Sequence, residues 1–256
     1  MICLGCETWG VSRPVPAATS TLRILRYLAH RPSPVPAGRI ALDLGLPRST
    51  TYHLLTAMAS ESFVVHYPEE RTWGVGVEAW EVGQGFTRQA PLARLARMPI
   101  ARLVDTLGLS AHLAVLHGGD VVYLIEERAR GQARLVTEVG VRMPAHLTAS
   151  GRAILAQLTP ANVRALYPSR DSFVHRTGLG PSGYTELRSI LAATRRRGYS
   201  EEDSEVTEGF SSVAVALRSP ANLAAVAVTW QGSRDDRSHV LDRLQATVAA
   251  IDGRLR

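Results

Sequence analysis

Residues 44–58, LGLPRSTTYHLLTAM, combine a helix stop, a helix start and a helical frame with two unlike faces. Gly45 suits the left-handed position that ends a helix, and Pro47 is favoured at the first position of the next. From that start, helical spacing places one set of side chains inward: Thr51, Leu54, Leu55 and Met58. The opposite face is polar and carries Arg48, Ser49, Thr50, Tyr52, His53 and Thr56. Such a face predicts a hydrogen-bonding partner outside the protein core.

The flanking sequence supplies the rest of a small domain. Apolar spacing predicts helices at 21–29, capped by Thr19 or Ser20, and at 37–44. After the polar helix, residues 63–67 and 72–77 are typical of strands joined by a short turn at 68–71. Three helices followed by a hairpin, with glycine in the turn between the second and third, predict a winged helix-turn-helix domain.

Local charge identifies the partner that this face suits. Between Arg13 and Ser60 there are six arginines and a single acid, Asp43. The first turn of a helix favours a phosphate, and arginine, tyrosine and histidine can reach phosphates or base edges in a major groove. A solvated helix face is the alternative, but the turn, the charge and the hairpin together favour DNA. The predicted DNA contacts are Arg48, Ser49, Thr50, Tyr52 and His53, with Arg71 at the hairpin tip.

The whole chain limits the other possibilities. Its 256 residues are enough for two domains, and a charged content of 20% with no apolar run of about 18 residues predicts a cytoplasmic protein without a membrane span. The net charge of +6 comes with no lysine at all, so we give it little weight. Cys3 and Cys6 form a lone CxxC without the further ligands of a zinc site, so no metal is expected.

The sequence divides into four parts. Residues 1–18 are expected to be a disordered leader, 19–76 the winged helix-turn-helix domain, 77–90 a linker helix, and 91–256 a second domain. In that domain, hairpins mixed with helices predict an α+β fold with an antiparallel sheet. The expected strands are 112–117, 121–126, 133–139, 213–217 and 223–230, and the expected helices are 94–107, 151–158, 187–197 and 240–255.

Three stretches in order resemble the isocitrate lyase regulator (IclR-type) family of bacterial transcriptional regulators. GLPRSTTYHLLTAM is similar to that family's recognition helix, RMPAHLTASGRAILAQL at 142–158 to its central motif, and RRGYSEEDSEVTEGFSSVAVALR at 196–218 to the stretch that closes its effector pocket. The resemblance covers residues 19 to 254. It implies a repressor or activator with a GAF-like C-terminal domain that binds a small metabolite, working as a dimer or a dimer of dimers on a palindromic operator.

The resemblance also implies the effector-binding residues. Matched position by position, the polar contacts are Ala149, Ser150, Asp203, Ser212, Ala227 and Thr229, and the apolar side is lined by Leu135 and Met143. This chain has Ala227 where the family has a serine, and Trp230-Gln231 where the family turns with Gly-Pro. Losing a hydroxyl donor disfavours the smallest polar acids, so a mid-sized organic acid or an aromatic metabolite is expected.

Two other functions remain open from the sequence. A small-molecule hydrolase or transferase in the second domain lacks an identifiable nucleophile and base, so no catalytic residue is assigned. A regulator that has lost its effector and responds to a protein partner is the other. The GxGxxG at 178–183 lacks the preceding strand and contains Pro181, so no nucleotide cofactor is expected. His112 and His117 lie five apart on and after a strand and do not form a metal clamp.

Overall fold

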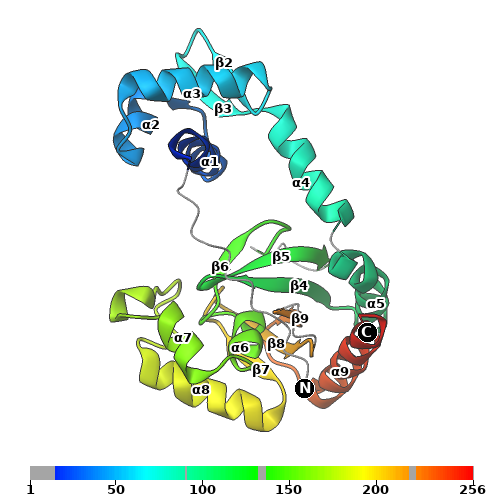
Figure 1. Ribbon diagram of the computed structural model, residues 1–256. Helices are drawn as coiled ribbons and strands as arrows, with labels where there is room; N and C mark the ends of the chain where they lie inside the picture. The colour runs from blue at the N-terminus through cyan, green and yellow to red at the C-terminus, as the bar shows by residue number, and fades with distance from the viewer. Residues whose placement is uncertain (1–14, 90, 132–136, 219–222, 256) are drawn as a thin grey trace, which may run out of the picture. The chain divides into compact units, whose positions relative to one another are not determined.

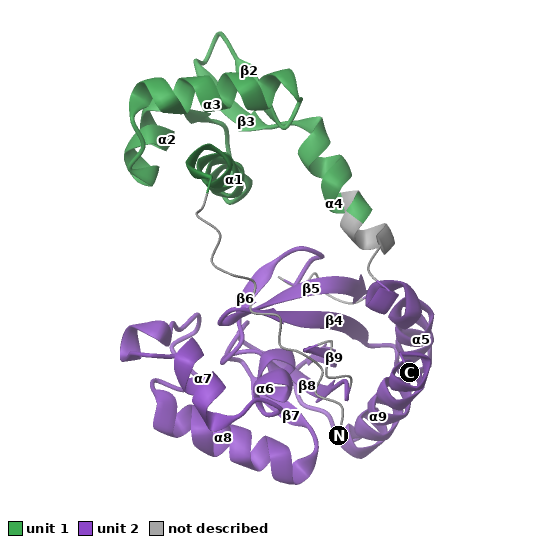
Figure 2. Cartoon of the chain, viewed as in Figure 1, with its two compact units in different colours: residues 1–86 green, residues 87–256 purple. Residues whose placement is uncertain are grey.

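The computed structural model describes residues 15–89, 91–131, 137–218 and 223–255, with the side chains at 84 and 86–89 left out. The chain forms two compact units, residues 1–86 and 87–256 (Figure 2). The boundary falls inside the helix that was expected to link two domains. Cys3, Cys6 and residues 1–14 of the expected leader lie outside the described residues, and residues 16–18 belong to a helix.

Three helices and a small sheet form the first part of unit 1 (Figure 1). Its elements are α1 (Pro16–Ala29), β1 (Val35–Pro36), α2 (Ala37–Leu44), α3 (Arg48–Ser60), β2 (Val64–Tyr67) and β3 (Thr72–Val75). The strands are antiparallel in the order β1-β3-β2. The winged helix-turn-helix prediction is confirmed. Helix α1 begins at Pro16, so Thr19 and Ser20 lie inside it instead of capping it, because a proline already occupies its first turn.

The turn between α2 and α3 forms as the sequence predicts. Gly45 has φ of 63° and ends α2, and the N–H of Leu46 donates to the carbonyl of Ala41 at 2.9 Å. Pro47, expected as the first residue of α3, is the residue before it, so the helix begins at Arg48. The inward face of α3 packs through Leu55 and Met58 into an apolar core shared with α1, α2 and the strands. That packing fixes which face of α3 remains outside.

Helix α4 (Val77–Gln89) follows the hairpin directly. A Cβ on Gly76 would lie 2.1 Å from the carbonyl oxygen of Ser62, so only glycine permits this close approach at the entry to α4. Along α4, Val77 and Trp80 share a face and are 59% and 63% exposed. Val82 is 60% exposed but lies about 200° around the helix from Trp80. These side chains therefore do not form a single apolar stripe along α4, and the side chain of Phe86 lies outside the described residues.

Unit 2 contains a six-stranded antiparallel sheet with helices on both faces (Figure 1). Its strands are β4 (Ser110–His117), β5 (Asp120–Glu127), β6 (Arg142–Pro144), β7 (Ser200–Asp203), β8 (Phe210–Ala216) and β9 (Ala224–Gln231), in the order β6-β5-β4-β9-β8-β7. Its helices are α5 (Pro91–Leu107), α6 (Ala149–Leu155), α7 (Pro160–Leu166), α8 (Tyr184–Arg197) and α9 (Arg237–Arg254), with a 3₁₀ turn at Arg170–Ser172. The predicted α+β fold is confirmed.

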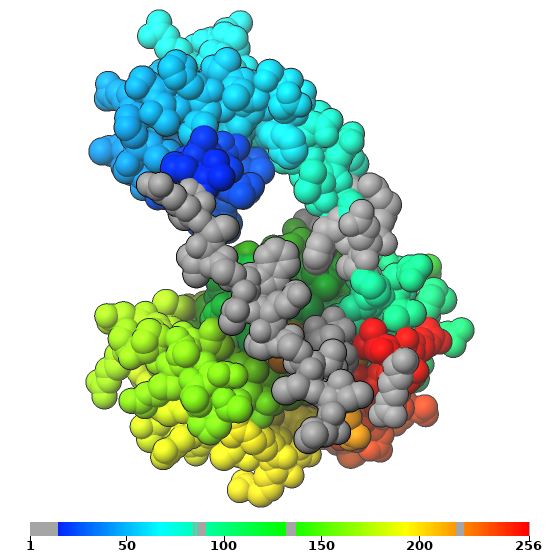
Figure 3. Space-filling model, in the orientation of Figure 1, coloured from blue at the N-terminus to red at the C-terminus, as the bar shows by residue number. Residues whose placement is uncertain are grey.

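Each face of this sheet has its own apolar core. Helices α5 and α9 cover one face over Val213, Val228 and Trp230. Helices α6, α7 and α8 lie on the other face, over Ala114, Ala214 and Ala227. In the space-filling view, α8 (yellow) and α9 (orange to red) cover different flanks of the unit (Figure 3). Side chains alternate between the two faces along each strand, so the face on which a residue lies determines what it can contact.

Several sequence expectations differ from the structure at element level. The strand expected at 133–139 is not formed at Thr137–Val139, and residues 133–136 lie outside the described residues. Strands β1, β6 and β7 and helix α7 were not expected. Each has eight residues or fewer, and short elements of mixed polarity leave little periodic signal. No helix within the described residues is long and apolar enough to cross a membrane.

Candidate functional site

The outer face of α3 is exposed as the sequence predicts. Arg48, Ser49, Thr50 and His53 are exposed, and Tyr52 is 52% exposed. Thr51 is fully buried between them, and its hydroxyl donates to the carbonyl of Pro47 at 3.0 Å. That bond satisfies the one polar group on the inner face, so α3 can bury one side without losing a hydrogen bond. The outer side offers a guanidinium, hydroxyls, a phenol and an imidazole to a ligand.

Arg71 lies in the turn between β2 and β3, at the tip of the wing. It adopts φ of 54°, its N–H donates to the carbonyl of Pro68 at 3.3 Å, and its side chain is exposed. Glu69 and Glu70 precede it in the same turn and are also exposed. On the strand behind, His66 stacks on Trp73 with ring centroids 4.4 Å apart. The wing therefore presents a single cation among acids at its tip.

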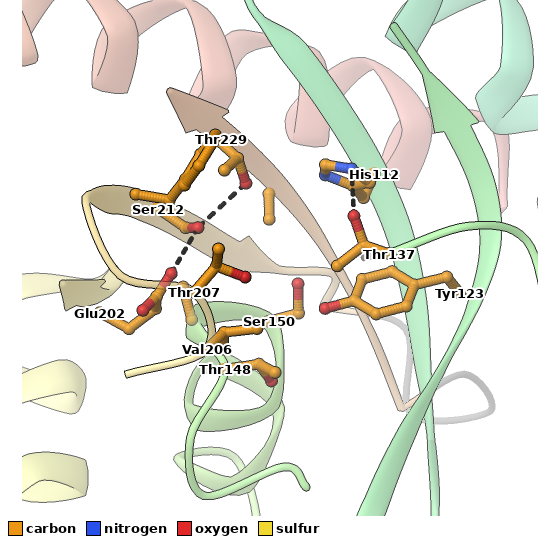
Figure 4. A pocket seen from close by; sticks show the side chains of 13 residues that line it. His112, Tyr123, Thr137, Thr148, Ser150, Glu202, Val206, Thr207, Ser212 and Thr229 are labelled. Atoms are coloured by element: carbon orange, nitrogen blue, oxygen red, sulfur yellow. Dashed lines mark hydrogen bonds between the residues drawn. The ribbon is translucent and has the colours of Figure 1, made fainter. Parts of the chain in front are cut away.

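A pocket opens on the α6 side of the sheet in unit 2 (Figure 4). Its cavity volume is about 30 Å³, and about 420 Å³ is free of atoms when the space open to solvent is included. Its residues come from β4, β5, β7, β8, β9, the start of α6 and the segments before β6 and after β7. They are His112, Tyr123, Thr137, Thr148, Ala149, Ser150, Glu202, Val206, Thr207, Phe210, Ser212, Ala227 and Thr229.

Five of the residues assigned by resemblance meet in this pocket: Ala149, Ser150, Ser212, Ala227 and Thr229. Met143 does not line it. Its side chain is buried in the core against α6. Leu135 lies outside the described residues. Trp230 faces the opposite core under α5 and α9, because it alternates with the pocket residue Thr229 along β9.

Asp203 is not the pocket acid; Glu202 is. In β7, Ser200 and Glu202 point inward and are buried, while Asp203 is exposed on the other side. Since side chains alternate along a strand, a one-residue error in register exchanges the two acids. Asp203 accepts a hydrogen bond from the hydroxyl of Ser211 at 3.0 Å on the outer face. The run Glu201-Glu202-Asp203 contains three acids in succession, so sequence matching alone could not fix the register.

Glu202 accepts hydrogen bonds from two groups. Its Oε1 accepts from the hydroxyl of Ser212 at 2.7 Å, and its Oε2 accepts from the backbone N–H of Glu205 at 3.3 Å. The hydroxyl of Ser212 in turn lies 2.9 Å from that of Thr229. Burial raises the pKa of the Glu202 carboxyl from 4.5 to about 7, although the hydroxyl of Ser212 and the nearby Arg152 act in the opposite direction.

Besides Glu202, seven lining residues were not predicted: Thr148, Val206, Thr207, Phe210 and three on the other side of the pocket. His112, Tyr123 and Thr137 form the other side, with Nε2 of His112 2.8 Å from the hydroxyl of Thr137. Burial lowers the pKa of His112 to about 4, so its imidazole is neutral near pH 7. Burial also raises the pKa of the Tyr123 hydroxyl, which stays protonated. One signal was available in the sequence, since His112 lies on the same strand face as Ala114. Sequence analysis considered His112 only as a metal ligand.

Arg152 joins three segments that line the pocket, and it is only 3% exposed. Its Nε donates to the carbonyl of His146 at 2.8 Å, before α6, and its Nη1 donates to that of Glu201 in β7 at 3.0 Å. Its Nη2 lies 2.6 Å from Oε2 of Glu205, an ion pair whose alignment falls outside hydrogen-bond geometry. One guanidinium thus holds the start of α6, strand β7 and the segment after it together.

Comparison with known proteins covers both units. The model of the IclR helix-turn-helix domain matches residues 17–68, and that of the C-terminal domain of the bacterial transcriptional regulator IclR matches residues 84–253. The acetate operon repressor of Salmonella typhimurium is 31% identical over 237 residues, covering 89% of this chain and 85% of that protein. The transcriptional repressor IclR of Escherichia coli is 30% identical over 233 residues, covering 87% of this chain and 83% of that protein.

Solved structures show the same fold. An IclR transcriptional regulator from Alicyclobacillus acidocaldarius aligns with a TM-score of 0.80 and 21% identity, over 94% of this chain and 99% of that one. An IclR homologue from Microbacterium hydrocarbonoxydans, solved in complex with 4-hydroxybenzoate, aligns with a TM-score of 0.76 and 19% identity, over 93% of this chain and 98% of that one.

Replacing the buried guanidinium should destabilise unit 2. Arg152→Met removes both donors to backbone carbonyls and leaves Glu205 without its cation, so we expect a loss of about 3 kcal/mol of unfolding free energy. The exposed Arg188 in α8 is the matched control, and Arg188→Met should change stability by less than about 0.5 kcal/mol. Chemical unfolding of both variants measures the difference. Equal, small effects would show that Arg152 does not carry this role.

The buried carboxyl should make stability depend on pH. Its pKa is raised on folding, so its favourable contribution is complete below about 4.5 and is lost as the pH rises through about 7. Glu202→Gln cannot ionise, so it should stabilise unit 2 relative to wild type more at pH 8 than at pH 5, by up to roughly 3 kcal/mol. Urea unfolding at both pH values tests this, with Asp203→Asn as the exposed control. The same stability difference at both pH values would contradict it.

Proposed function

The chain belongs to the IclR family of bacterial transcriptional regulators, and from that membership we propose how it binds DNA and its effector. It is a ligand-responsive, DNA-binding regulator of transcription. The residue assignments are our proposal. Helix α3 enters the major groove and the wing contacts the backbone, while the pocket of unit 2 takes a small organic molecule. The relatives at 31% and 30% identity are repressors, so we propose repression, in the cytoplasm where a bacterial chromosome lies.

The exposed polar face of α3 carries the DNA-binding proposal. Arg48 is at the first position of α3, where the free N–H groups of the helix also favour a phosphate. Tyr52 and His53 lie one turn further along, within reach of base edges once the helix is in a groove. Arg71 is the phosphate contact of the wing.

For the effector, the mixed lining of the pocket favours a molecule with polar and apolar parts. A homologue of this fold carries 4-hydroxybenzoate, and we propose a mid-sized or aromatic organic acid for this chain. Binding must favour one arrangement of the regulator to change operator affinity. Catalysis by this domain is not part of the proposal, because its relatives are regulators. Operator binding should weaken steeply with added salt, as phosphate contacts release counterions, whereas hydrolysis need not.

A paired experiment separates the two roles. Arg48→Ala should weaken operator binding roughly tenfold to a hundredfold at fixed salt and leave binding of 4-hydroxybenzoate unchanged. Ser212→Leu fills the pocket, so it should keep operator affinity and abolish release from the operator by 4-hydroxybenzoate. Gel-shift titrations and calorimetry measure both. If Arg48→Ala left operator affinity intact, α3 would be misassigned; equal ligand response in Ser212→Leu would place the effector elsewhere.

The exposed face of α4 supports a proposal about assembly. We place Val77 and Trp80 against the same segment of a second chain, since a palindromic operator is read by a two-fold dimer. A tetramer would be a dimer of such dimers. Trp80→Glu should therefore give monomers at micromolar concentration in sedimentation equilibrium. Val82→Glu adds the same charge on the far side of the helix and should remain dimeric. A monomeric wild type would refute the dimer.

A further inference from the structure

The polar wall of the pocket formed by Glu202, Ser212 and Thr229, here named the acceptor wall, has a defined hydrogen-bond direction (Figure 4). A serine hydroxyl has one proton, and that of Ser212 is committed to Oε1 of Glu202 at 2.7 Å. The 2.9 Å contact between Ser212 and Thr229 must then be donated by Thr229. Both hydroxyl protons therefore point along the wall toward the carboxylate. The oxygen atoms of the acceptor wall therefore offer a ligand only lone pairs, which accept hydrogen bonds.

The carboxylate itself has unused capacity. An ionised carboxylate can accept about four hydrogen bonds, whereas Glu202 accepts one at each oxygen, from Ser212 and from the N–H of Glu205. The residue is 5% exposed, so water contributes little. A buried carboxylate that is bonded only in part is costly, and a donor that enters the pocket relieves this cost.

No described residue of the lining supplies a cation to offset an incoming anion. Glu202 is the acid among those residues, and the imidazole of His112 is neutral near pH 7. Arg152 is close enough to affect Glu202, but its three nitrogens are directed to two backbone carbonyls and to Glu205. A ligand carboxylate against the acceptor wall would face a like charge and lone pairs in a desolvated site.

The opposite side of the pocket differs in character. The hydroxyls of Tyr123 and Ser150 lie away from the acceptor wall in Figure 4. Phe210, Val206 and Ala227 add apolar surface to the lining. The alanine at 227 adds no hydroxyl to this lining. A molecule that spans the pocket thus meets acceptors at one end and hydroxyl donors at the other.

We infer that the effector donates a hydrogen bond to Glu202 through a hydroxyl or an amino group, and that any acidic group it carries lies at the Tyr123 end. This rests on the proposed effector function of the pocket and narrows its chemical class. A hydroxy or amino compound fits, and a hydroxy acid fits in one orientation only. A simple carboxylate with no donor does not fit.

The test compares three probes of one size on the full-length protein: benzyl alcohol, benzylamine and benzoate. At about pH 8, where Glu202 is mostly ionised, wild type should bind the alcohol or the amine more tightly than benzoate. Glu202→Gln should weaken the preferred donor probe roughly tenfold or more and strengthen benzoate. Asp203→Asn, the neighbouring acid on the outer face, should change none of these. The alcohol and the amine distinguish a neutral donor from a cation.

Proton linkage provides a second readout in the same titrations. Near pH 7, a donor that prefers ionised Glu202 should release protons on binding, whereas a carboxylate that needs it neutral should take protons up. Calorimetry in two buffers of different ionisation enthalpy measures the sign, and Glu202→Gln should abolish it. The charges of Glu205 and Arg152 act on Glu202, and the charge of Glu202 in turn helps to raise the pKa of Tyr123.

Two results would overturn the inference. One is that neither donor probe binds at millimolar concentration; the other is that benzoate binds wild type most tightly and gains nothing in Glu202→Gln. Failure of the proposed function is recognised separately. Donor probes could bind in a manner that depends on Glu202 and yet leave operator affinity unchanged in gel shifts. That result would support the inferred class of ligand and would contradict the proposal that this pocket controls DNA binding.

Discussion

The arrangement of unit 2 around its pocket depends on one buried cation. Arg152 is almost fully enclosed, and its guanidinium contacts the chain before α6, the edge strand β7 and the segment that follows it. A planar group with five donors can serve three directions at once, which a lysine ammonium does less well. Two of the acceptors are backbone carbonyls, so Arg152 holds main-chain positions and not only side chains. Every pocket residue on β7 and on the segment after it takes its place from this arrangement.

The same arrangement explains why α6 begins where it does. A Cβ on Gly151 would lie 2.2 Å from the carbonyl oxygen of Ala145, so the helix approaches the preceding segment as closely as backbone allows. Thr148 caps the helix by accepting from the N–H of Gly151 at 2.9 Å. In the TASGR stretch, Gly151 thus allows the close approach, Thr148 caps the helix, and Arg152 holds the neighbouring segments. Together they bring Ala149 and Ser150 to the pocket.

Sequence reasoning reached the helix-turn-helix because its signals are local. Gly45, Pro47 and the two-faced spacing of α3 lie within fifteen residues, and each acts through backbone geometry that holds in any context. The pocket draws on six strands and helices far apart in the chain, so the residues that share it are set by register. A match to a family motif located the β7 region but not the face of each acid, and one residue of error exchanged Asp203 for Glu202. His112 and Tyr123 carry no motif of their own, and only the sheet order brings them opposite Glu202.

A carboxyl placed as Glu202 is placed would be a poor choice for stability alone. Burial raises its pKa to about 7, which means that the folded chain resists its ionisation. A glutamine could accept from Ser212 without that cost. Natural sequences tend to depart from local consistency at functional sites, and a half-satisfied acid at the end of a directed chain of hydroxyls is such a departure. The segment after β7 contacts this carboxyl through the N–H of Glu205, and Glu205 also pairs with Arg152. A ligand donor that competes with the N–H of Glu205 for Oε2 of Glu202 would therefore act on Glu205, the residue that pairs with Arg152. Binding in the pocket is thereby connected to the ion pair between Arg152 and Glu205.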